Sequence, residues 1–205
     1  MTNEPSAHWE NVYATKDAAE VSWFEESPAL SLELIAEAYD GRGGVIDIGG
    51  GASRLAGALV EAGYVPVAVL DLSANALAVA KAKLGKAAEC VEWIVADVTA
   101  WHPATRFDVW HDRAAFHFLT DSAQQQAFAQ ALRAALNPGG IAIIGTFAPD
   151  GPEKCSGLPV ARHNAASIAA ILGDGFDLIS ERRHEHLTPG GSVQKFQFST
   201  FRRTP

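Results

Sequence analysis

Three aspartates follow short apolar stretches, and glycines follow the first of them. The stretch VIDIGGG places Asp47 two residues before Gly49 and four before Gly51. Asp71 ends the apolar stretch VPVAVLD, and Asp97 ends VEWIVAD. A carboxylate accepts hydrogen bonds from hydroxyl and amino groups, and a glycine turn lets the backbone approach a ligand closely. These residues predict a site for a small polar ligand.

The spacing of the glycines argues against a phosphate. A dinucleotide-binding turn reads GxGxxG, but counted from Gly49 the last glycine position holds Arg54. A P-loop requires GKS or GKT, which the sequence lacks. An adenosine-type ligand fits better, because Asp71 can accept hydrogen bonds from both ribose hydroxyls. Asp97 and the following Val98 then lie at the height of the adenine.

A second group of polar residues follows the stretch FDVWHD. We interpret Asp112 as the residue that contacts or orients the substrate, and His117 as the candidate general base. Two alternatives stay open. His117 can equally be a structural residue that caps its loop, and His111 can pack against Trp110.

Aromatic residues gather near the N-terminus, in the stretch HWENVYATKDAAEVSWF. Trp9, Tyr13 and Trp23 are either core residues or part of a lid. As a lid they exclude water and present flat faces that attract a sulfonium or a methylated ammonium. Two further features have open roles, Cys155 in the loop APDGPEKCSGLPV and the basic cluster of Arg182, Arg183, His184 and His186.

Alternating strands and helices must position these residues. Near-continuous apolar stretches predict strands that are covered on both faces, and the stretches between them predict helices. We therefore predict an α/β fold, a doubly wound Rossmann-like sheet that is mostly parallel with an antiparallel C-terminal hairpin. The predicted strands span residues 45–48, 65–71, 91–97, 107–112 and 141–147, the hairpin strands 176–187 and 192–201, and the helices about 53–62, 74–84 and 122–136.

Capping residues mark where several helices start and stop. We expect Ser27 to cap a helix with Pro28 in its first position, and Ser73 to cap the helix 74–84. Thr120 or Asp121 caps the helix 122–136, and the sequence NPGG at residues 137–140 stops it.

Length and composition set broader limits. A chain of 205 residues favours a single domain, 1–205, with an N-terminal lid and helix (1–44) before a Rossmann-like core (45–205). The net charge of −8 argues against a nucleic-acid partner. Two distant cysteines predict neither a disulfide framework nor a metal site. With no apolar stretch of membrane-spanning length and no signal-like N-terminus, we expect a cytoplasmic location without membrane contact.

From about His8 to Arg203 the sequence resembles the class I, seven-stranded methyltransferases that use S-adenosylmethionine. The resemblance implies that Gly49 and Gly51 lie beside the methionine end of this cofactor. It also implies that Asp71 binds the ribose hydroxyls and that Asp97 binds the adenine amino group. The product is then S-adenosylhomocysteine. The full set of cofactor residues that it implies is Trp9, Tyr13, Trp23, Asp47, Gly49, Gly51, Asp71, Leu72, Asp97, Val98 and Asp112.

Within that class, the aromatic segment is similar to the N-terminal segment of small methyltransferases related to the elongation-factor lysine methyltransferases. Their fourth-strand motif reads roughly Asp-Lys-Gly-Thr. This sequence keeps Asp112, and it has Arg113, Ala114 and Ala115 in place of the rest.

These patterns predict an enzyme that methylates a small molecule or a protein side chain, with its acceptor atom and oligomeric state open. No NPPY-like tetrad follows the fourth strand, which argues against methylation of a nucleobase amine. Three alternatives remain: a non-catalytic module that binds S-adenosylmethionine, a scaffold for a partner, and a nicotinamide-dependent oxidoreductase.

Overall fold

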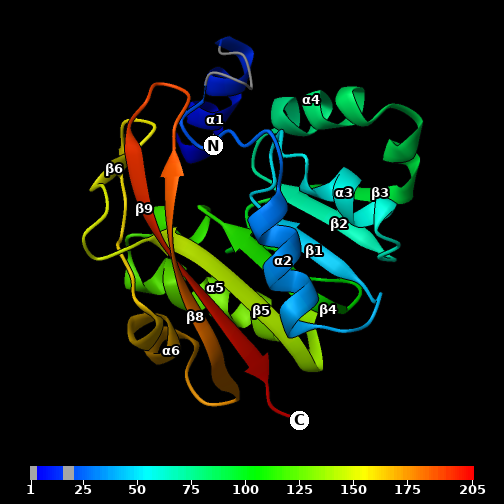
Figure 1. Cartoon of the computed structure of the whole chain (residues 1–205), viewed down its shortest axis with the longest axis vertical. Coiled ribbons are helices and arrows are strands. Elements are labelled where there is room, and N and C mark those ends of the chain that lie inside the picture. The colour runs from blue at the N-terminus through cyan, green and yellow to red at the C-terminus, as the bar shows by residue number, and fades with distance from the viewer. Residues whose placement is uncertain (1–3, 16–20) are drawn as a thin grey trace.

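The computed structural model describes residues 4–15 and 21–205, and within them a central sheet carries helices on both faces (Figure 1). The sheet has seven strands in the order β3-β2-β1-β4-β5-β9-β8. β9 runs antiparallel to both of its neighbours, β5 and β8, and the other adjacent strands are parallel. The predicted fold class is confirmed. The strands are β1 (Val45–Ile48), β2 (Val67–Asp71), β3 (Val91–Val95), β4 (Phe107–Arg113), β5 (Leu136–Phe147), β8 (Phe176–Leu187) and β9 (Val193–Arg203).

Two apolar cores separate the sheet from its helices. One core joins the sheet to α2, α3 and α4, and the other joins it to α5 and α6. Every residue of β1 and β2 is buried, because these central strands are covered on both faces. The helices are α1 (Glu4–Thr15), α2 (Ala29–Ala38), α3 (Leu55–Glu61), α4 (Ala74–Leu84), α5 (Ser122–Ala135) and α6 (Ala165–Leu172), with the short 3-10 helices η1 (Gly85–Cys90) and η2 (Phe116–Phe118).

Several predicted boundaries are confirmed. Helix α4 spans the predicted residues, and its cap Ser73 accepts a hydrogen bond from the Ala76 N–H at 3.0 Å. Asp121 caps α5 by accepting from the Ala123 N–H at 2.8 Å. The C-terminal hairpin is also present, as β8 and β9.

Other boundaries differ from the prediction. Ser27 does not cap α2, because the helix begins at Ala29 and Pro28 takes the cap position. The sequence NPGG follows the end of α5 but lies inside β5, where the Asn137 side chain donates a hydrogen bond to Asp108. The predicted loop after β5 contains a small two-stranded sheet, β6 (Lys154–Cys155) and β7 (Leu158–Pro159). Helices α1 and α6 were not predicted.

Helix α1 lies beyond the end of the sheet, beside α4 (Figure 1). The Glu10 carboxylate accepts hydrogen bonds from the Ala74 N–H at 2.5 Å and the Asn75 N–H at 3.3 Å. A carboxylate at this position satisfies free N–H groups of the first turn of α4 and complements the helix dipole. The predicted aromatic lid is therefore anchored to the helix that follows Asp71. Residues 16–20 of that segment lie outside the described residues.

Candidate functional site

The carboxyl ends of β1, β2 and β3 meet at a cavity of about 570 Å³. Parallel strands end at the same edge of a sheet, and ligands of open α/β sheets bind beyond that edge. The sheet edge forms one side of the cavity, and α1 and Trp23 form another. Eight of the predicted cofactor residues line it: Trp9, Tyr13, Trp23, Gly49, Asp71, Leu72, Asp97 and Val98.

The glycine turn leaves little room for side chains. Gly49 has φ +63°, and its N–H donates a hydrogen bond to the Leu70 carbonyl at 2.7 Å. A Cβ at Gly49 would lie 2.5 Å from the Cβ of Ala115, and one at Gly51 (φ +47°) would lie 2.6 Å from the Tyr13 hydroxyl. Glycine at both positions is required by the backbone conformation and by the close approach of neighbours.

We expect Gly49→Ala to destabilise the protein by more than the roughly 1–2 kcal/mol that an αL conformation costs a residue with a Cβ. Gly63→Ala is the matched control, because Gly63 also has positive φ (+84°) and no atom within 4 Å of its ideal Cβ. Urea unfolding of both variants measures the difference. Adding Ala115→Gly to Gly49→Ala should restore the stability that Gly49→Ala loses beyond Gly63→Ala. If Gly49→Ala and Gly63→Ala lose equal stability, the contact with Ala115 has no effect and the expectation is wrong.

Asp71 is nearly buried, with 8% of its surface exposed. Its Oδ1 accepts a hydrogen bond from the Ser73 N–H at 2.8 Å. Burial raises the pKa of this carboxyl to about 6, although the backbone N–H groups of Ser73 and Gly51 oppose the shift. Asp71 is therefore mainly ionised at neutral pH, and it contributes an acceptor of hydrogen bonds to the cavity.

Asp97 lies in the turn that follows β3. Its Oδ1 accepts hydrogen bonds from the Thr99 N–H at 2.9 Å and the Thr99 hydroxyl at 2.7 Å. These contacts hold the carboxylate at the cavity wall, next to Val98. The spacing along the sequence thus brings Asp71 and Asp97 to one cavity, as predicted from parallel strands.

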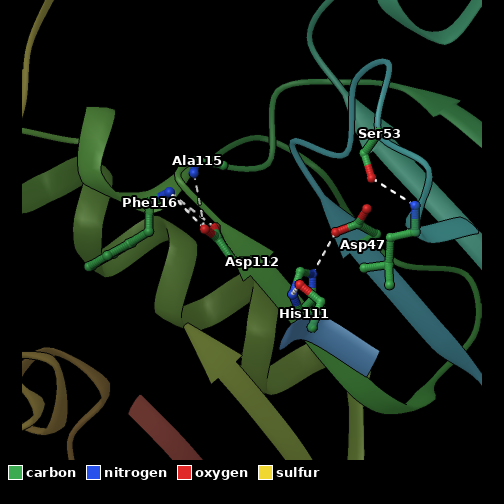
Figure 2. A network of polar contacts seen from close by, with 8 residues as sticks. Asp47, Ser53, His111, Asp112, Ala115 and Phe116 are labelled. Atoms are coloured by element: carbon green, nitrogen blue, oxygen red, sulfur yellow. Dashed lines mark hydrogen bonds and ion pairs between the residues drawn. The ribbon is translucent and has the colours of Figure 1, made fainter. Parts of the chain in front are cut away.

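Asp47 does not line this cavity. Its Oδ1 lies 2.7 Å from His111 Nδ1, and the other ring nitrogen, Nε2, lies 3.0 Å from the Ser31 hydroxyl (Figure 2). All three side chains are buried, and they connect β1, β4 and α2. Asp47 and His111 also line a narrow cavity of about 50 Å³ beside Gly49.

The alternative in which His111 packs against Trp110 is wrong. Successive residues of a strand point to opposite faces, and the two side chains belong to opposite sides of the sheet. Trp110 packs against Phe128 at 5.3 Å between ring centroids, in the core beneath α5.

Asp112 is placed differently from the prediction. Its carboxylate is fully buried and accepts hydrogen bonds from the N–H groups of Ala115 and Phe116 at 3.0 Å (Figure 2). It does not line either cavity described above. Its contacts organise the turn between β4 and η2, so its position does not support contact with a substrate or cofactor.

Burial raises the pKa of Asp112 to about 7. A carboxyl with a folded-state pKa above its unfolded value of 3.8 contributes stability that is complete below that value and is lost as pH rises through about 7. We therefore expect the wild type to lose stability relative to Asp112→Asn as the pH rises from about 4 to about 7. Urea unfolding at several pH values measures this difference. The exposed Asp177→Asn is the control, and parallel profiles for wild type and Asp112→Asn would contradict the expectation.

His117 is also displaced from its predicted role. The Phe147 N–H donates to its Nδ1 at 3.4 Å, and its ring lies between Phe118 and Phe147. Burial, with a smaller effect of nearby His163, lowers the pKa of His117 to about 3. The ring is fully buried and does not line the cavity. This environment fits a structural histidine better than a general base.

Several cavity residues were missed by sequence reasoning. They lie on α1 and near η2, which the sequence patterns did not predict as parts of one wall. His8 stands beside Trp9 in the aromatic segment, and this proximity was the available signal. The missed residues include His8, Phe118 and Leu119.

The sequence left open the roles of the basic cluster on the hairpin and of Cys155. Arginines of the cluster form ion pairs within the chain, and Cys155 is buried. Arg182 pairs with Glu33 and Glu37, and Arg183 pairs with Asp150, so the hairpin cations bind the chain's own carboxylates. Cys155 lines the cavity but is 4% exposed, and burial raises the pKa of its thiol to about 11. This thiol is protonated at neutral pH.

Residues 45–140 match the family model described as a methyltransferase domain. No curated protein sequence matches the chain. In the described part of the chain, every helix is too short or too polar to cross a membrane.

Many solved structures share the fold. The N-methyltransferase NodS of Bradyrhizobium japonicum, solved with S-adenosylhomocysteine, has a TM-score of 0.75 and 15% identity over 98% of this chain and 99% of its own. A methyltransferase from Anabaena variabilis has a TM-score of 0.76 and 15% identity over 97% and 95%. The 1,6-didemethyltoxoflavin N1-methyltransferase of Burkholderia thailandensis, solved with bound 1,6-didemethyltoxoflavin and S-adenosylhomocysteine, has a TM-score of 0.69 and 20% identity over 98% of this chain and 85% of its own. The chain therefore has the class I methyltransferase fold, and the match of residues 45–140 to the methyltransferase domain model covers part of it.

Proposed function

We propose that this protein is a methyltransferase that uses S-adenosylmethionine to methylate a small molecule or an accessible side chain. One observation carries the proposal. A single cavity is lined by the glycine turn at Gly49, by the strand-end carboxylates Asp71 and Asp97, and by aromatic residues of α1. The fold and the match to the methyltransferase domain model support it.

The residues of the cavity fit this cofactor. The close approach at Gly49 admits a ligand beside the backbone but no side chain. We assign Asp71 to the ribose hydroxyls and Asp97, with Val98, to the adenine. A carboxylate that is held by backbone N–H groups in a mostly buried position is pre-organised for such charge-assisted hydrogen bonds.

The methyl group of bound S-adenosylmethionine is already activated for transfer to a nucleophile, so the protein mainly has to align the acceptor and exclude water. Trp9, Tyr13 and Trp23 cover the cavity, and Tyr13 lies close to the glycine turn. We infer that this cover shields the reacting groups. Because α1 contacts α4 and α2 packs on the core, we also propose that residues 1–44 and 45–205 act as one domain.

Titration calorimetry with S-adenosylmethionine, S-adenosylhomocysteine and NADH tests the cofactor. We expect the two sulfur nucleosides to bind and NADH not to bind. Binding of NADH alone would overturn the proposal in favour of an oxidoreductase. Turnover with any acceptor would separate an enzyme from a module that only binds the cofactor, and release of S-adenosylhomocysteine in an acceptor screen measures it.

A further inference from the structure

The cavity has two chemically different parts. The part at the sheet edge carries the carboxylates Asp71 and Asp97, which we assigned to the cofactor. The remaining wall comes from α1, η2 and its following loop, and the β6–β7 sheet, and it is mainly apolar. Its residues are Trp9, Phe118, Leu119, Cys155, Leu158 and Pro159.

Aromatic rings give this apolar wall flat and well-defined surfaces. The Trp9 ring lies 5.0 Å from the Phe118 ring and 5.5 Å from the Trp23 ring, with interplanar angles of 75° and 80°. Such edge-to-face contacts hold rings in fixed orientations. The neutral thiol of Cys155 behaves as a small apolar group. A flat apolar molecule therefore complements this wall.

The same wall has no free charge to offer a charged acceptor. Arg113 is the only lysine or arginine among the described residues that line the cavity. Its guanidinium lies 3.3 Å from the Glu25 carboxylate and donates to the Trp23 carbonyl at 2.9 Å. A carboxylate or an ammonium group placed against the apolar wall would lose its hydration without gaining a free opposite charge.

Polar residues border this wall, among them His8, Thr120 and Gln124, and His8 has the only imidazole among the described residues of the cavity lining. The His8 ring lies 5.1 Å from the Trp9 ring, and its Nε2 is 3.5 Å from the Ser156 hydroxyl on the β6–β7 connection. His8 is half-buried and lines the cavity. A neutral imidazole accepts a hydrogen bond, and it can also accept the proton that an O–H or N–H group loses on methylation.

We propose that the acceptor is a flat, uncharged and mainly apolar molecule, bound against Trp9, Phe118 and Leu158 with its O–H or N–H group facing His8. The proposal rests on the proposed function, since it assigns the sheet-edge part of the cavity to the cofactor. It narrows the acceptor class, because it excludes lysine side chains and carboxylates.

Calorimetry of the protein saturated with S-adenosylhomocysteine tests the proposal with three probes. The probes are 2-naphthol, 2-naphthoate and N-acetyl-lysine methylamide, which present a neutral ring, an anionic ring and a flexible cation. We expect 2-naphthol to bind at least tenfold more tightly than either charged probe. Equal or tighter binding of a charged probe, or no binding of 2-naphthol, overturns the acceptor assignment while the cofactor assignment stands. Failure of S-adenosylhomocysteine itself to bind overturns both.

Two variants locate the probe in the cavity. Leu158→Asp adds a charge to the apolar wall, and we expect it to weaken 2-naphthol binding at least tenfold. Leu187→Asp adds the same charge at a residue that is 66% exposed and outside this cavity, and it should leave binding unchanged. Unchanged binding of S-adenosylhomocysteine shows that both variants fold. Equal effects of the two variants on 2-naphthol would overturn the placement.

The hydrogen bond between His8 and the acceptor is tested by removing the hydroxyl proton of the probe and, separately, the imidazole of the protein. 2-Methoxynaphthalene lacks the hydroxyl proton, so we expect the wild type to bind it about threefold to tenfold more weakly than 2-naphthol, the range for one hydrogen bond. His8→Leu should abolish this preference by weakening 2-naphthol alone. The same preference in wild type and variant would remove His8 from the proposal.

Discussion

Asp71→Ala is expected to weaken the binding of S-adenosylmethionine by roughly 2–3 kcal/mol or more, which is about 30-fold to 150-fold or more. Loss of the carboxylate removes at least two charge-assisted hydrogen bonds to the ribose in our assignment. Titration calorimetry measures the effect. Affinity equal to that of the wild type would show that the ribose assignment is wrong.

Two further variants separate binding from folding. Asp71→Asn keeps an oxygen that can accept from the Ser73 N–H but carries no charge, so we expect an intermediate loss of affinity. Asp177→Ala removes an exposed carboxylate on β8 and should leave binding unchanged. Because burial raises the pKa of Asp71, its charge opposes folding above about pH 6. Asp71→Asn should then bind less tightly without losing stability at neutral pH.

The raised pKa also predicts how binding depends on pH. Below about pH 6 Asp71 becomes protonated in the free protein, and the neutral carboxyl is a weaker acceptor for the ribose hydroxyls. We expect the affinity of the wild type for S-adenosylhomocysteine to fall between pH 7 and pH 5. Asp71→Asn should lose this part of the dependence. An identical pH profile in both proteins would assign the dependence to another group.

His111→Leu is expected to produce the largest loss of stability, about 3–5 kcal/mol, because it leaves the buried Asp47 carboxylate without its partner. The exposed fractions of His111 and Asp47 are 1% and 3%, so the pair is shielded from bulk solvent (Figure 2). Ser31→Ala should cost only about 1 kcal/mol, since it removes a single hydrogen bond of an uncharged hydroxyl. Urea unfolding at pH 7 measures both variants.

A double-mutant cycle identifies the pair as the cause. Asp47→Asn removes the charge, so adding His111→Leu to that variant should cost less than His111→Leu costs in the wild type. His102→Leu is the control at an exposed histidine and should change stability by less than about 0.5 kcal/mol. Additive losses at positions 47 and 111 would mean that the two side chains contribute independently.

Much of the fold followed from local patterns. Near-continuous apolar stretches predicted the strands, and two such stretches joined by the turn sequence TPGG (188–191) predicted the terminal hairpin, because strand propensity and turn chemistry depend on neighbouring residues. The shared location of Asp71 and Asp97 also followed, since parallel strands bring their carboxyl ends to one edge. These parts of the site were determined by residue type and spacing.

The partners of individual polar side chains were decided only by the tertiary structure. Asp47 and His111 lie 64 positions apart, and no local pattern showed that they would satisfy each other in the interior. Asp112 and His117 have the residue types of a catalytic pair, yet the turn after β4 directs the first to backbone N–H groups and buries the second. His8 reaches the cavity because α1 docks on α4, a contact that depends on Glu10 and on the folded position of the first turn of α4. The sequence by itself determined the strands and the edge at which a ligand binds, because these depend on short-range periodicity. Which side chains face that ligand depends on long-range packing, and the folded chain decided it.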